Sequence, residues 1–238
     1  MTPGRDKEKK SDANRDITRK LPAKITSIRP QKNNKDRYSL FIDGAFVIGI
    51  AESTLLEFQI EEGMELTPYL LNRLQQAEGR EAVRTYCLRM LARRDHSRKE
   101  LFDKARKKDH PADLVEGVLD ELEEKGYLDD RTFARTFASD KSRLNNWGPA
   151  KIKAHLFKKG IPESIADEGI DAAFEELDLK ETLFDLVKKK KRRFRREEDL
   201  FRRKKKIFDY LYRKGYRSES IFRVLDELAA SVEESEFG

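Results

Sequence analysis

The sequence is poor in the features of disulfide-bonded, secreted or membrane-embedded proteins. Cys87 is the only cysteine among 238 residues, so no disulfide can form within the chain, as is typical of a reducing compartment. No apolar run approaches the roughly 18 residues that a transmembrane helix requires. The first residues also lack the apolar segment of a secretion signal. These absences predict a cytoplasmic protein that makes no membrane contact.

Recognisable catalytic and metal-binding patterns are missing too. The chain has no glycine-rich phosphate loop and no nucleophile elbow. Its three histidines, at positions 96, 110 and 155, are scattered, and no His or Cys pair has metal-ligand spacing. Helix capping accounts for acidic pairs such as Asp129-Asp130. We therefore expect no catalytic residue, no metal and no cofactor, and predict a non-enzymatic protein.

Charged residues, by contrast, are abundant and unevenly placed. They make up 40% of the chain, against a hydrophobic fraction of 37%, and the net charge is +6. The basic tract, residues 188–206, contains thirteen Lys or Arg and three acids, whereas residues 226–238 carry five acids and no Lys or Arg. So polar a composition favours thin helical layers over the thick core of an α/β enzyme. The opposed blocks indicate either an anionic partner for the basic tract or a solvated helix surface.

The first 78 residues divide into a tail and a small module. Residues 1–20 are rich in Lys, Asp, Arg and Asn and contain no aromatic, so a disordered basic tail is expected. Apolar segments at 25–28, 38–42 and 46–50 predict strands, and Asp43-Gly44 predicts a tight hairpin between the last two. Short helices are expected at 51–58 and 68–76, which completes an α/β leader module over residues 21–78.

From residue 81 onward, apolar positions recur with helical spacing and repeat as a block. Offsets of 51 and 55 residues superpose Leu101, Ile152 and Ile207, and eight residues later they superpose Asp109, Gly160 and Gly215. Glycine just after a helix allows the positive φ that ends it. We therefore predict a mainly α protein, with three tandem three-helix repeats at 79–126, 127–177 and 178–230 and an acidic tail at 231–238. The repeats are expected to form an elongated, curved array behind the β-hairpin-containing leader module.

Two cations precede the aligned Asp or Gly in every repeat, at 107–108, 158–159 and 213–214. Two explanations remain open, because cations stabilise a helix C-terminus and a repeated basic stripe also suits a polymeric anionic partner. The candidate partner-binding residues are Arg94, Lys151, Lys158, Lys159, Arg213 and Lys214. The candidate nucleic-acid-binding residues, all in the basic tract, are Lys188, Lys189, Lys190, Lys191, Arg192, Arg193, Arg195, Arg196, Arg202 and Arg203.

Aromatic residues interleave with the cations of the third repeat, a pattern that can stack nucleic-acid bases. They are Phe194, Phe201, Phe208, Tyr210 and Tyr212. We expect Phe208 and Tyr212 in the core instead, because they share the helical face of Leu211. Trp147, at a turn between helices, is likewise expected to pack rather than to stack bases.

Four segments of the chain resemble motifs of the RecX family, small bacterial proteins that regulate the RecA recombinase. Residues 91–101 resemble its opening "L..R..S..EL", 126–134 its "G.LDD..FA", 148–161 its "G..+I...L..KGI" and 211–216 its "L..+GF". Together the match extends from Glu81 to Leu228. The chain departs from the family at Asp109-His110, where lysine-glycine is frequent, and in the basic tract, which is expected to lengthen the first two helices of the third repeat.

The resemblance implies a non-enzymatic modulator that binds the RecA–single-stranded DNA filament. Members of the family lie along the filament groove and typically limit its extension, ATPase and recombination activity, in DNA repair and the SOS response. For this chain we expect a monomer whose partners are the RecA filament and single-stranded DNA, with the DNA bound weakly or only together with RecA. The alternatives are a nucleic-acid-binding helical repeat that acts without RecA and a scaffold that links other proteins.

Overall fold

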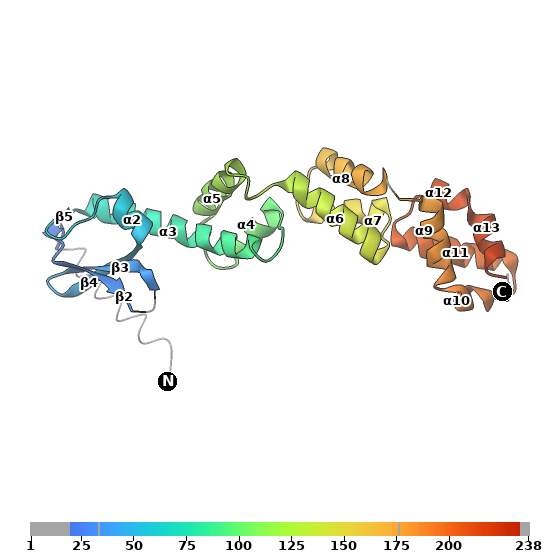
Figure 1. Cartoon of the computed structure of the whole chain (residues 1–238), viewed down its shortest axis with the longest axis horizontal. Helices are drawn as coiled ribbons and strands as arrows, with labels where there is room; N and C mark the ends of the chain where they lie inside the picture. Colours follow the sequence, from blue (N-terminus) through green and yellow to red (C-terminus); the bar gives the residue numbers. More distant parts are fainter. Residues whose placement is uncertain (1–19, 33, 176, 234–238) are drawn as a thin grey trace, which may run out of the picture. The chain divides into compact units, whose positions relative to one another are not determined.

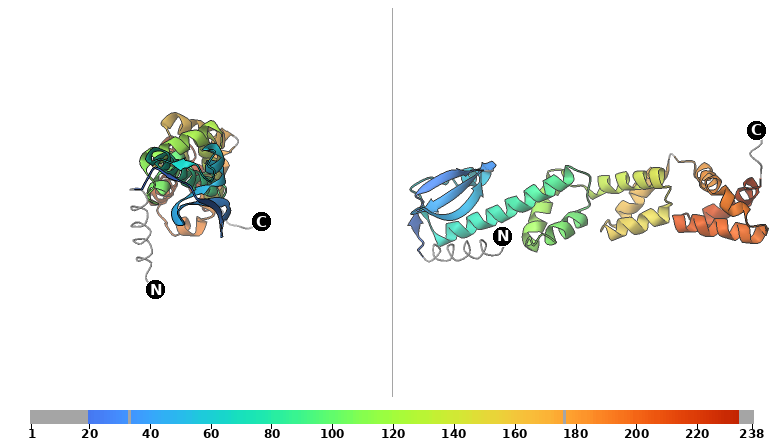
Figure 2. Two further views of the ribbon diagram at one scale, coloured as in Figure 1. Left: turned by 90° about the vertical axis from the view of Figure 1, so that its left-hand side faces the viewer. Right: turned by 90° about the horizontal axis from the view of Figure 1, so that it is seen from below.

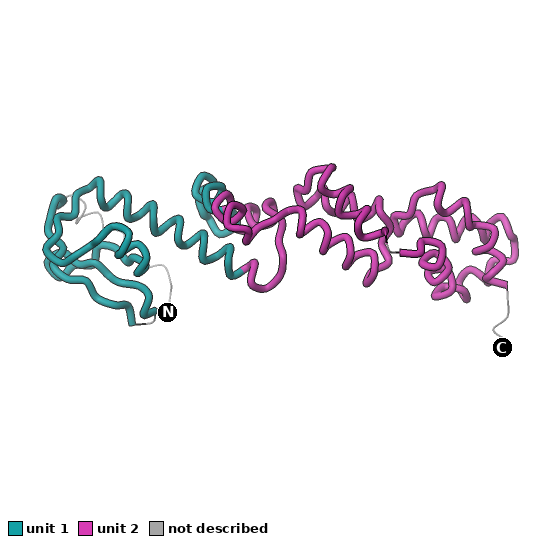
Figure 3. The backbone as a smooth tube through the Cα atoms, turned by 45° about the horizontal axis from the view of Figure 1, so that its top comes forward, with its two compact units in different colours: residues 1–89, 105–118 teal, residues 90–104, 119–238 magenta. Residues whose placement is uncertain are grey.

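The structure is a computed structural model that describes residues 20–32, 34–175 and 177–233 (Figure 1). Its residue contacts divide the chain into two compact units, one of residues 1–89 with 105–118 and one of residues 90–104 with 119–238 (Figure 3). The expected tail at residues 1–19 and most of the acidic tail, from residue 234 on, lie outside the described residues. Within the described ranges, no helix is long and apolar enough to cross a membrane.

The leader module is built on small antiparallel sheets. The three-stranded sheet consists of β2 (Ser27–Gln31), β3 (Asn34–Ile42) and β4 (Ala45–Ala51), and the two-stranded sheet of β1 (Ala23–Lys24) and β5 (Glu65–Leu66). Asp43 and Gly44 join β3 to β4 with φ values of 47° and 76°. Two positive φ angles in a two-residue turn match the twist of a hairpin, so the predicted hairpin is confirmed.

The carboxylate of Glu78 ties the long helix α3 (Pro68–Leu91) to this module. It accepts hydrogen bonds from the Arg37 guanidinium at 2.7 Å, the Ala51 amide at 2.7 Å and the Thr54 hydroxyl at 2.8 Å. Thr54 belongs to α2 (Glu52–Glu57). Three donors on one part-buried carboxylate hold the sheet, α2 and α3 together.

Helix α3 is longer than the sequence pattern predicted. It runs without interruption from Pro68 to Leu91, so the expected end at residue 76 is wrong. Gly79 lies inside it because the helix passes close to a neighbour: a Cβ atom at Gly79 would lie 2.9 Å from a methyl carbon of Leu114. The leader module and the first repeat thus share one helix, which crosses the expected boundary between residues 78 and 79.

Three helical repeats follow, as predicted. The first adds α4 (Arg98–Arg106) and α5 (Ala112–Glu124) to the end of α3, and the second consists of α6 (Asp130–Asn145), α7 (Pro149–Lys158) and α8 (Glu163–Glu175). The third consists of α9 (Leu179–Lys188), α10 (Lys191–Arg195), α11 (Leu200–Lys214), α12 (Ser218–Phe222) and α13 (Leu225–Ser231). Helices α6, α7 and α8 pack together, as Figure 1 and the right-hand view of Figure 2 show.

Local helix signals in the repeats act as the sequence indicated. Asp109, Gly160 and Gly215 have φ values of 62°, 80° and 95°, so the aspartate adopts the same left-handed conformation as the two glycines. Asp129 caps α6 by accepting the Arg131 amide at 2.9 Å. Asp109 therefore keeps the left-handed conformation of the aligned glycines, although α4 already ends at Arg106.

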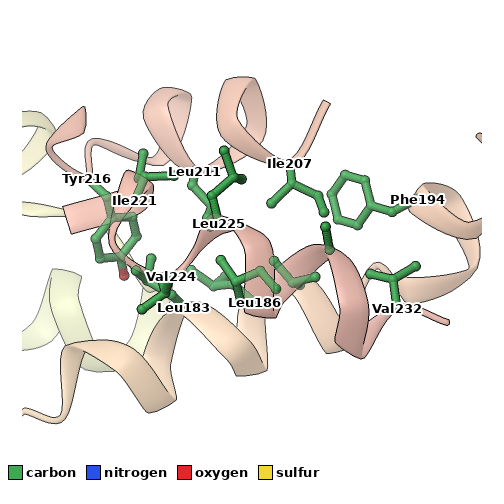
Figure 4. Close-up of a cluster of buried hydrophobic side chains, with 13 residues drawn as sticks. Leu183, Leu186, Phe194, Ile207, Leu211, Tyr216, Ile221, Val224, Leu225 and Val232 are labelled. Carbon is green, nitrogen blue, oxygen red and sulfur yellow. The ribbon is translucent and has the colours of Figure 1, made fainter. Parts of the chain in front are cut away.

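The third repeat differs from expectation in the basic tract. Helix α9 ends at Lys188 after ten residues, and the tract continues as a turn, the short α10 and the start of α11. It does not lengthen α9, although α11, with fifteen residues, is longer than the corresponding ten-residue α7. Phe194 of α10 is buried and points toward Ile207 (Figure 4). Phe194 is thus a core residue, and base stacking is excluded for it.

The expectation that Tyr212 belongs to the core is wrong. Helix α11 buries a narrow stripe of residues four apart, Arg203, Ile207 and Leu211. Tyr212 lies about 100° further round the helix than Leu211, and it is 58% exposed. Phe208, closer to the stripe, packs against the core of the third repeat and is partly buried, as expected.

Candidate partner-binding surface

The six candidate partner-binding residues lie at two junctions between successive repeats, both inside the second unit. At the first junction, the start of α4 meets the end of α7. At the second, the start of α7 meets the end of α11. Figure 1 labels the three helices α4, α7 and α11. The three helices occupy aligned positions in their repeats, and at each junction the C-terminal end of one meets the N-terminal end of the aligned helix in the preceding repeat.

The first junction is made by side chains. The Ser97 hydroxyl donates to the Lys159 carbonyl at 2.7 Å and accepts the Glu100 amide at 3.2 Å, which caps α4. Gly160 permits the approach, because a Cβ atom there would lie 2.7 Å from Cβ of Lys99. Asp130 adds a second cap by accepting the Arg98 amide at 2.9 Å. Ser97 therefore caps α4, and the same hydroxyl also joins two repeats.

An ion-pair network centred on Glu100 holds two cations at the first junction. Its carboxylate accepts from the ammonium of Lys159 at 2.5 Å and from the guanidinium of Arg94 at 3.2 Å. Burial alone would raise the pKa of Glu100, but the hydrogen bonds and charges of Lys159 and Arg94 outweigh it and lower that pKa to about 2. Arg94 and Lys159 are thus brought together as predicted candidates, but both are partly engaged within the fold.

A groove opens beside this network. It has a volume of about 490 Å³ and is lined by Arg94, Phe133, Phe137, Lys141 and Lys159, with Asp95, Thr136 and Asp140. The two phenylalanine rings stack at 5.9 Å, and the Lys159 ammonium lies 5.6 and 5.4 Å from their centroids. The groove therefore combines an aromatic floor with cations and carboxylates of mixed sign.

The second junction is made by backbone groups. The Gly148 amide donates to the Lys214 carbonyl at 2.8 Å, and the Ala150 amide donates to the Gly215 carbonyl at 3.0 Å. A Cβ atom at Gly148 would lie 2.3 Å from the carbonyl carbon of Gly215. Carbonyls at the end of α11 thereby satisfy amides at the start of α7, which have no partner within their own helix. The two glycines permit this direct contact between repeats.

Cations gather at the second junction, and none of them forms an ion pair with a carboxylate of the described residues. Burial lowers the pKa of Lys214, and the charges of Lys151, Lys190 and Lys189 lower it further. The Lys214 ammonium donates to the Asn145 carbonyl, and that of Lys151 lies 4.5 Å from the Trp147 ring centroid. We call Lys151, Lys189, Lys190 and Lys214 the cationic cluster. It unites candidates from the repeat pairs with candidates from the basic tract, which the sequence placed on separate surfaces.

The cations extend from this cluster along α7. His155 packs against Trp147 at 4.5 Å between ring centroids, and the tryptophan is partly buried against the core of the second repeat, in line with the expectation of packing. Burial lowers the pKa of His155, as do the charges of Lys158, Lys151, Lys159 and Lys141. Lys158 and Arg213, the first members of their pairs, are exposed, whereas Lys159 and Lys214 are half-buried.

The remaining basic-tract candidates are dispersed over several elements. Lys188 ends α9, α10 spans residues 191–195, Arg196 follows it, and Arg202 is exposed on α11. Arg203 is 4% exposed and donates to the Glu197 carbonyl at 3.0 Å and to the Glu233 carboxylate. It belongs to the interior of the third repeat and is not available to a phosphate, so we remove it from the candidate surface.

The fold and this surface define a helical-repeat protein with a cationic face at the joint between two repeats. The chain belongs to the RecX family. Family models match at residues 23–67 (Regulatory protein RecX N-terminal domain), 84–122 (first three-helix domain), 129–170 (second) and 178–225 (third). These matches cover the leader module and all three repeats.

Individual relatives support the assignment. Regulatory protein RecX of Clostridium beijerinckii is 29% identical over 209 residues, which are 87% of this chain and 97% of the relative. That of Listeria monocytogenes is 29% identical over 196 residues, 82% of this chain and 72% of the relative. A crystal structure of regulatory protein RecX superposes with a TM-score of 0.72 at 27% identity, covering 86% of this chain and 99% of that structure. The crystal structure of RecX from Lactobacillus salivarius gives 0.57 at 26% identity, covering 65% and 99%.

Proposed function

We propose that this protein binds the RecA–single-stranded DNA filament through the face that carries the cationic cluster, and that binding lowers the filament's ATPase, extension and recombination activity. Membership of a family whose relatives are named regulatory proteins supports a regulatory role. The resemblance of the repeat motifs to that family points to RecA as the partner. On this proposal the protein acts by binding alone.

The observation that carries the proposal is the group of cations at the second junction, to which the described residues give no acidic partner. Four ammonium groups lie close enough for three of them to lower the pKa of the fourth, Lys214. Like charges so arranged repel one another, and an anionic partner relieves that repulsion. A nucleoprotein filament presents phosphates and acidic side chains along its length, and successive repeats with exposed Lys158 and Arg213 can follow it.

The test replaces the charge at one position while leaving the fold in place. Lys151→Glu puts a carboxylate near Lys214, at the position aligned with Glu100 of the first junction. Because the new acid neutralises Lys214 and faces an anionic partner, we expect at least a tenfold rise in the protein concentration that half-inhibits RecA's ATPase on single-stranded DNA, an order-of-magnitude value. Lys125→Glu is the matched control, because it makes the same charge change at an exposed helix end that belongs to neither junction.

Two outcomes would contradict the proposal. Wild-type protein that leaves RecA's ATPase and strand exchange unchanged at saturation would refute RecA regulation. Equal loss in Lys151→Glu and Lys125→Glu would refute the assignment to the second junction. If the wild-type protein binds DNA tightly and salt-dependently but has no effect on RecA, the alternative of a nucleic-acid-binding helical repeat that acts alone replaces the proposal.

A further inference from the structure

Helix α11 carries two exposed aromatic side chains, Phe201 and Tyr212, on the same face as Phe208, which is partly buried against the core. Phe201, Phe208 and Tyr212 follow one another at spacings of seven and four residues, which places them on one face of the helix. Phe201 is 77% and Tyr212 58% exposed. Phe222 of α12, 62% exposed, joins them, with its ring 4.9 Å from that of Phe208. These four residues are the aromatic row.

The rings of the aromatic row lie nearly parallel where they meet. Phe208 and Tyr212 stack at 5.8 Å with an interplanar angle of 12°, and Phe208 and Phe222 are inclined by 27°. From Phe201 to Tyr212 the row extends about 16 Å along the helix axis, at about 1.5 Å per residue. Successive nucleotides of one strand are about 3.4 Å apart in a stacked helix, so several nucleotides fit along it.

Unpaired cations accompany the row. Helical spacing places Lys205 beside Phe208 and Tyr212 and Arg202 next round the helix, while Arg223 follows Phe222 directly. All three are exposed, and within the described part of the chain their side chains have no carboxylate partner. Neighbouring Lys204 and Lys206 do have such partners, in Asp226 and Glu197. The cations next to the aromatic row are thus the ones left free to bind an anion.

We propose that the aromatic row stacks the bases of single-stranded nucleic acid while Arg202, Lys205 and Arg223 contact its phosphates. Aromatic rings beside a basic row form the combination that binds single strands without sequence preference, because every base has a π-face. Charge complementarity favours this occupant over an apolar protein surface, which would leave the three cations without partners. A duplex does not fit equally well, since its bases already stack on each other.

This inference goes beyond the proposed function, because it concerns nucleic acid bound in the absence of RecA. Its site also differs from the cationic cluster of the second junction. The sequence pattern suggested stacking for the third repeat, but the expectation that Tyr212 is a core residue argued against it. The exposure of Tyr212 removes that objection.

The test measures binding of a fluorescent oligothymidylate to the full chain by anisotropy, over a range of salt concentrations and without RecA. Phe201→Ala and Tyr212→Ala are each expected to weaken binding about fivefold or more, with an unchanged slope of log affinity against log salt. Arg202→Gln and Lys205→Gln should instead flatten that slope, by about 0.7 for each lost phosphate contact. Binding to a duplex of the same length should not respond to the aromatic changes.

Matched controls separate stacking from general damage. Tyr127→Ala removes an aromatic that is 60% exposed outside the row and should bind as wild type. Tyr212→Phe keeps the aromatic ring and should bind as tightly as wild type. Retained binding in this variant shows that the loss in Tyr212→Ala comes from the missing ring and not from misfolding. The inference is overturned if Phe201→Ala and Tyr212→Ala bind the oligonucleotide as wild type. It is also overturned if these variants lose only their effect on RecA's ATPase, because the row would then dock on protein.

Discussion

The two junctions between repeats use the same aligned positions with different chemistry. Ser97 and Gly148 correspond at the offset of 51 residues, and Lys159 and Lys214 at the offset of 55. In the first junction the Ser97 hydroxyl donates to the Lys159 carbonyl, whereas in the second the Gly148 amide itself donates to the Lys214 carbonyl. One carbonyl position is therefore satisfied in both places, by a side chain in one and by the backbone in the other.

A second aligned pair decides the charge of each junction. Glu100 of the first corresponds to Lys151 of the second. Glu100 pairs with both Arg94 and Lys159 and offsets part of their positive charge, while Lys151 adds to the repulsion on Lys214. Hydrogen bonds therefore join the repeats at both junctions, from a hydroxyl at the first and from backbone amides at the second. Charge at this position is free to vary, and the second junction is the one able to attract an anionic partner.

The largest effect should follow from adding a methyl group at the second junction. In Gly148→Ala the new Cβ would overlap the carbonyl of Gly215, so α7 and α11 must separate and both backbone hydrogen bonds break. We expect a loss of about 3 kcal/mol in unfolding free energy, the upper end for overpacking. Hydrogen exchange at the Gly148 and Ala150 amides should accelerate, which mass spectrometry of that peptide measures.

Gly117→Ala is the control for that change. Gly117 lies inside α5, and a Cβ atom there meets nothing within 4 Å, so alanine should leave stability unchanged or raise it by up to about 1 kcal/mol. If the amides of residues 148 and 150 exchange at wild-type rates in the Gly148→Ala variant, the second junction is not closed in solution.

Features that depend on short stretches of chain were predictable from the sequence. The Asp43-Gly44 hairpin, the Asp129 cap and the three repeats each rest on residues whose backbone preferences act locally. Asp109 shows the limit of a motif comparison, because its left-handed conformation performs the role of the glycine it replaces. Such signals located the helix ends where the candidate cations lie.

Contacts between distant residues were not predictable in the same way. Ser97 reads as a helix cap, and nothing nearby in the sequence indicates that its hydroxyl also bonds Lys159, 62 positions away. The same holds for Glu78, whose three donors come from the leader module, and for Arg203, which a charge count cannot distinguish from its exposed neighbours. Burial of one charged side chain depends on packing across the whole repeat, so the candidate surface needed the structure.

An intermediate effect should come from acid at the first junction. The pKa of Glu100 is about 2 in the folded chain and about 4.5 ordinarily. A lowered carboxyl pKa contributes stability that is present above the unfolded value and is lost as pH falls through the folded one. The contribution of Glu100 should therefore disappear between about pH 5 and pH 2. Glu100→Gln removes a charge-assisted pair and should cost about 2 kcal/mol at pH 7.

Denaturant unfolding of both proteins at a series of pH values measures this difference. The gap between wild type and Glu100→Gln should narrow steadily as the pH is lowered, because the wild-type carboxyl becomes neutral as well. A gap that stays constant from pH 7 to pH 3 would mean that the Glu100 ion pairs do not stabilise the first junction.

The smallest effect should distinguish the two lysines at the end of α7. Both meet the negative end of the same helix dipole, so that contribution cancels when they are compared. Lys159 additionally bonds Glu100 and lies over Phe133 and Phe137, whereas the Lys158 side chain is exposed without an ion-pair partner in the described structure. We expect Lys159→Gln to lower the free energy of unfolding by about 1 kcal/mol and Lys158→Gln by less than about 0.5 kcal/mol. Both changes can be derived from the shift in the thermal midpoint of unfolding.

The same pair of variants should reverse its order in the RecA ATPase assay. The exposed Lys158 ammonium can contact a partner, whereas the Lys159 ammonium is already paired with Glu100. Lys158→Gln should therefore weaken inhibition of the RecA ATPase more than Lys159→Gln. A basic pair at a helix end then has two separate roles, one cation joining neighbouring repeats and the other facing outward. If Lys158→Gln and Lys159→Gln change stability and inhibition by equal amounts, the two lysines act together. The separate roles assigned to them would then be wrong.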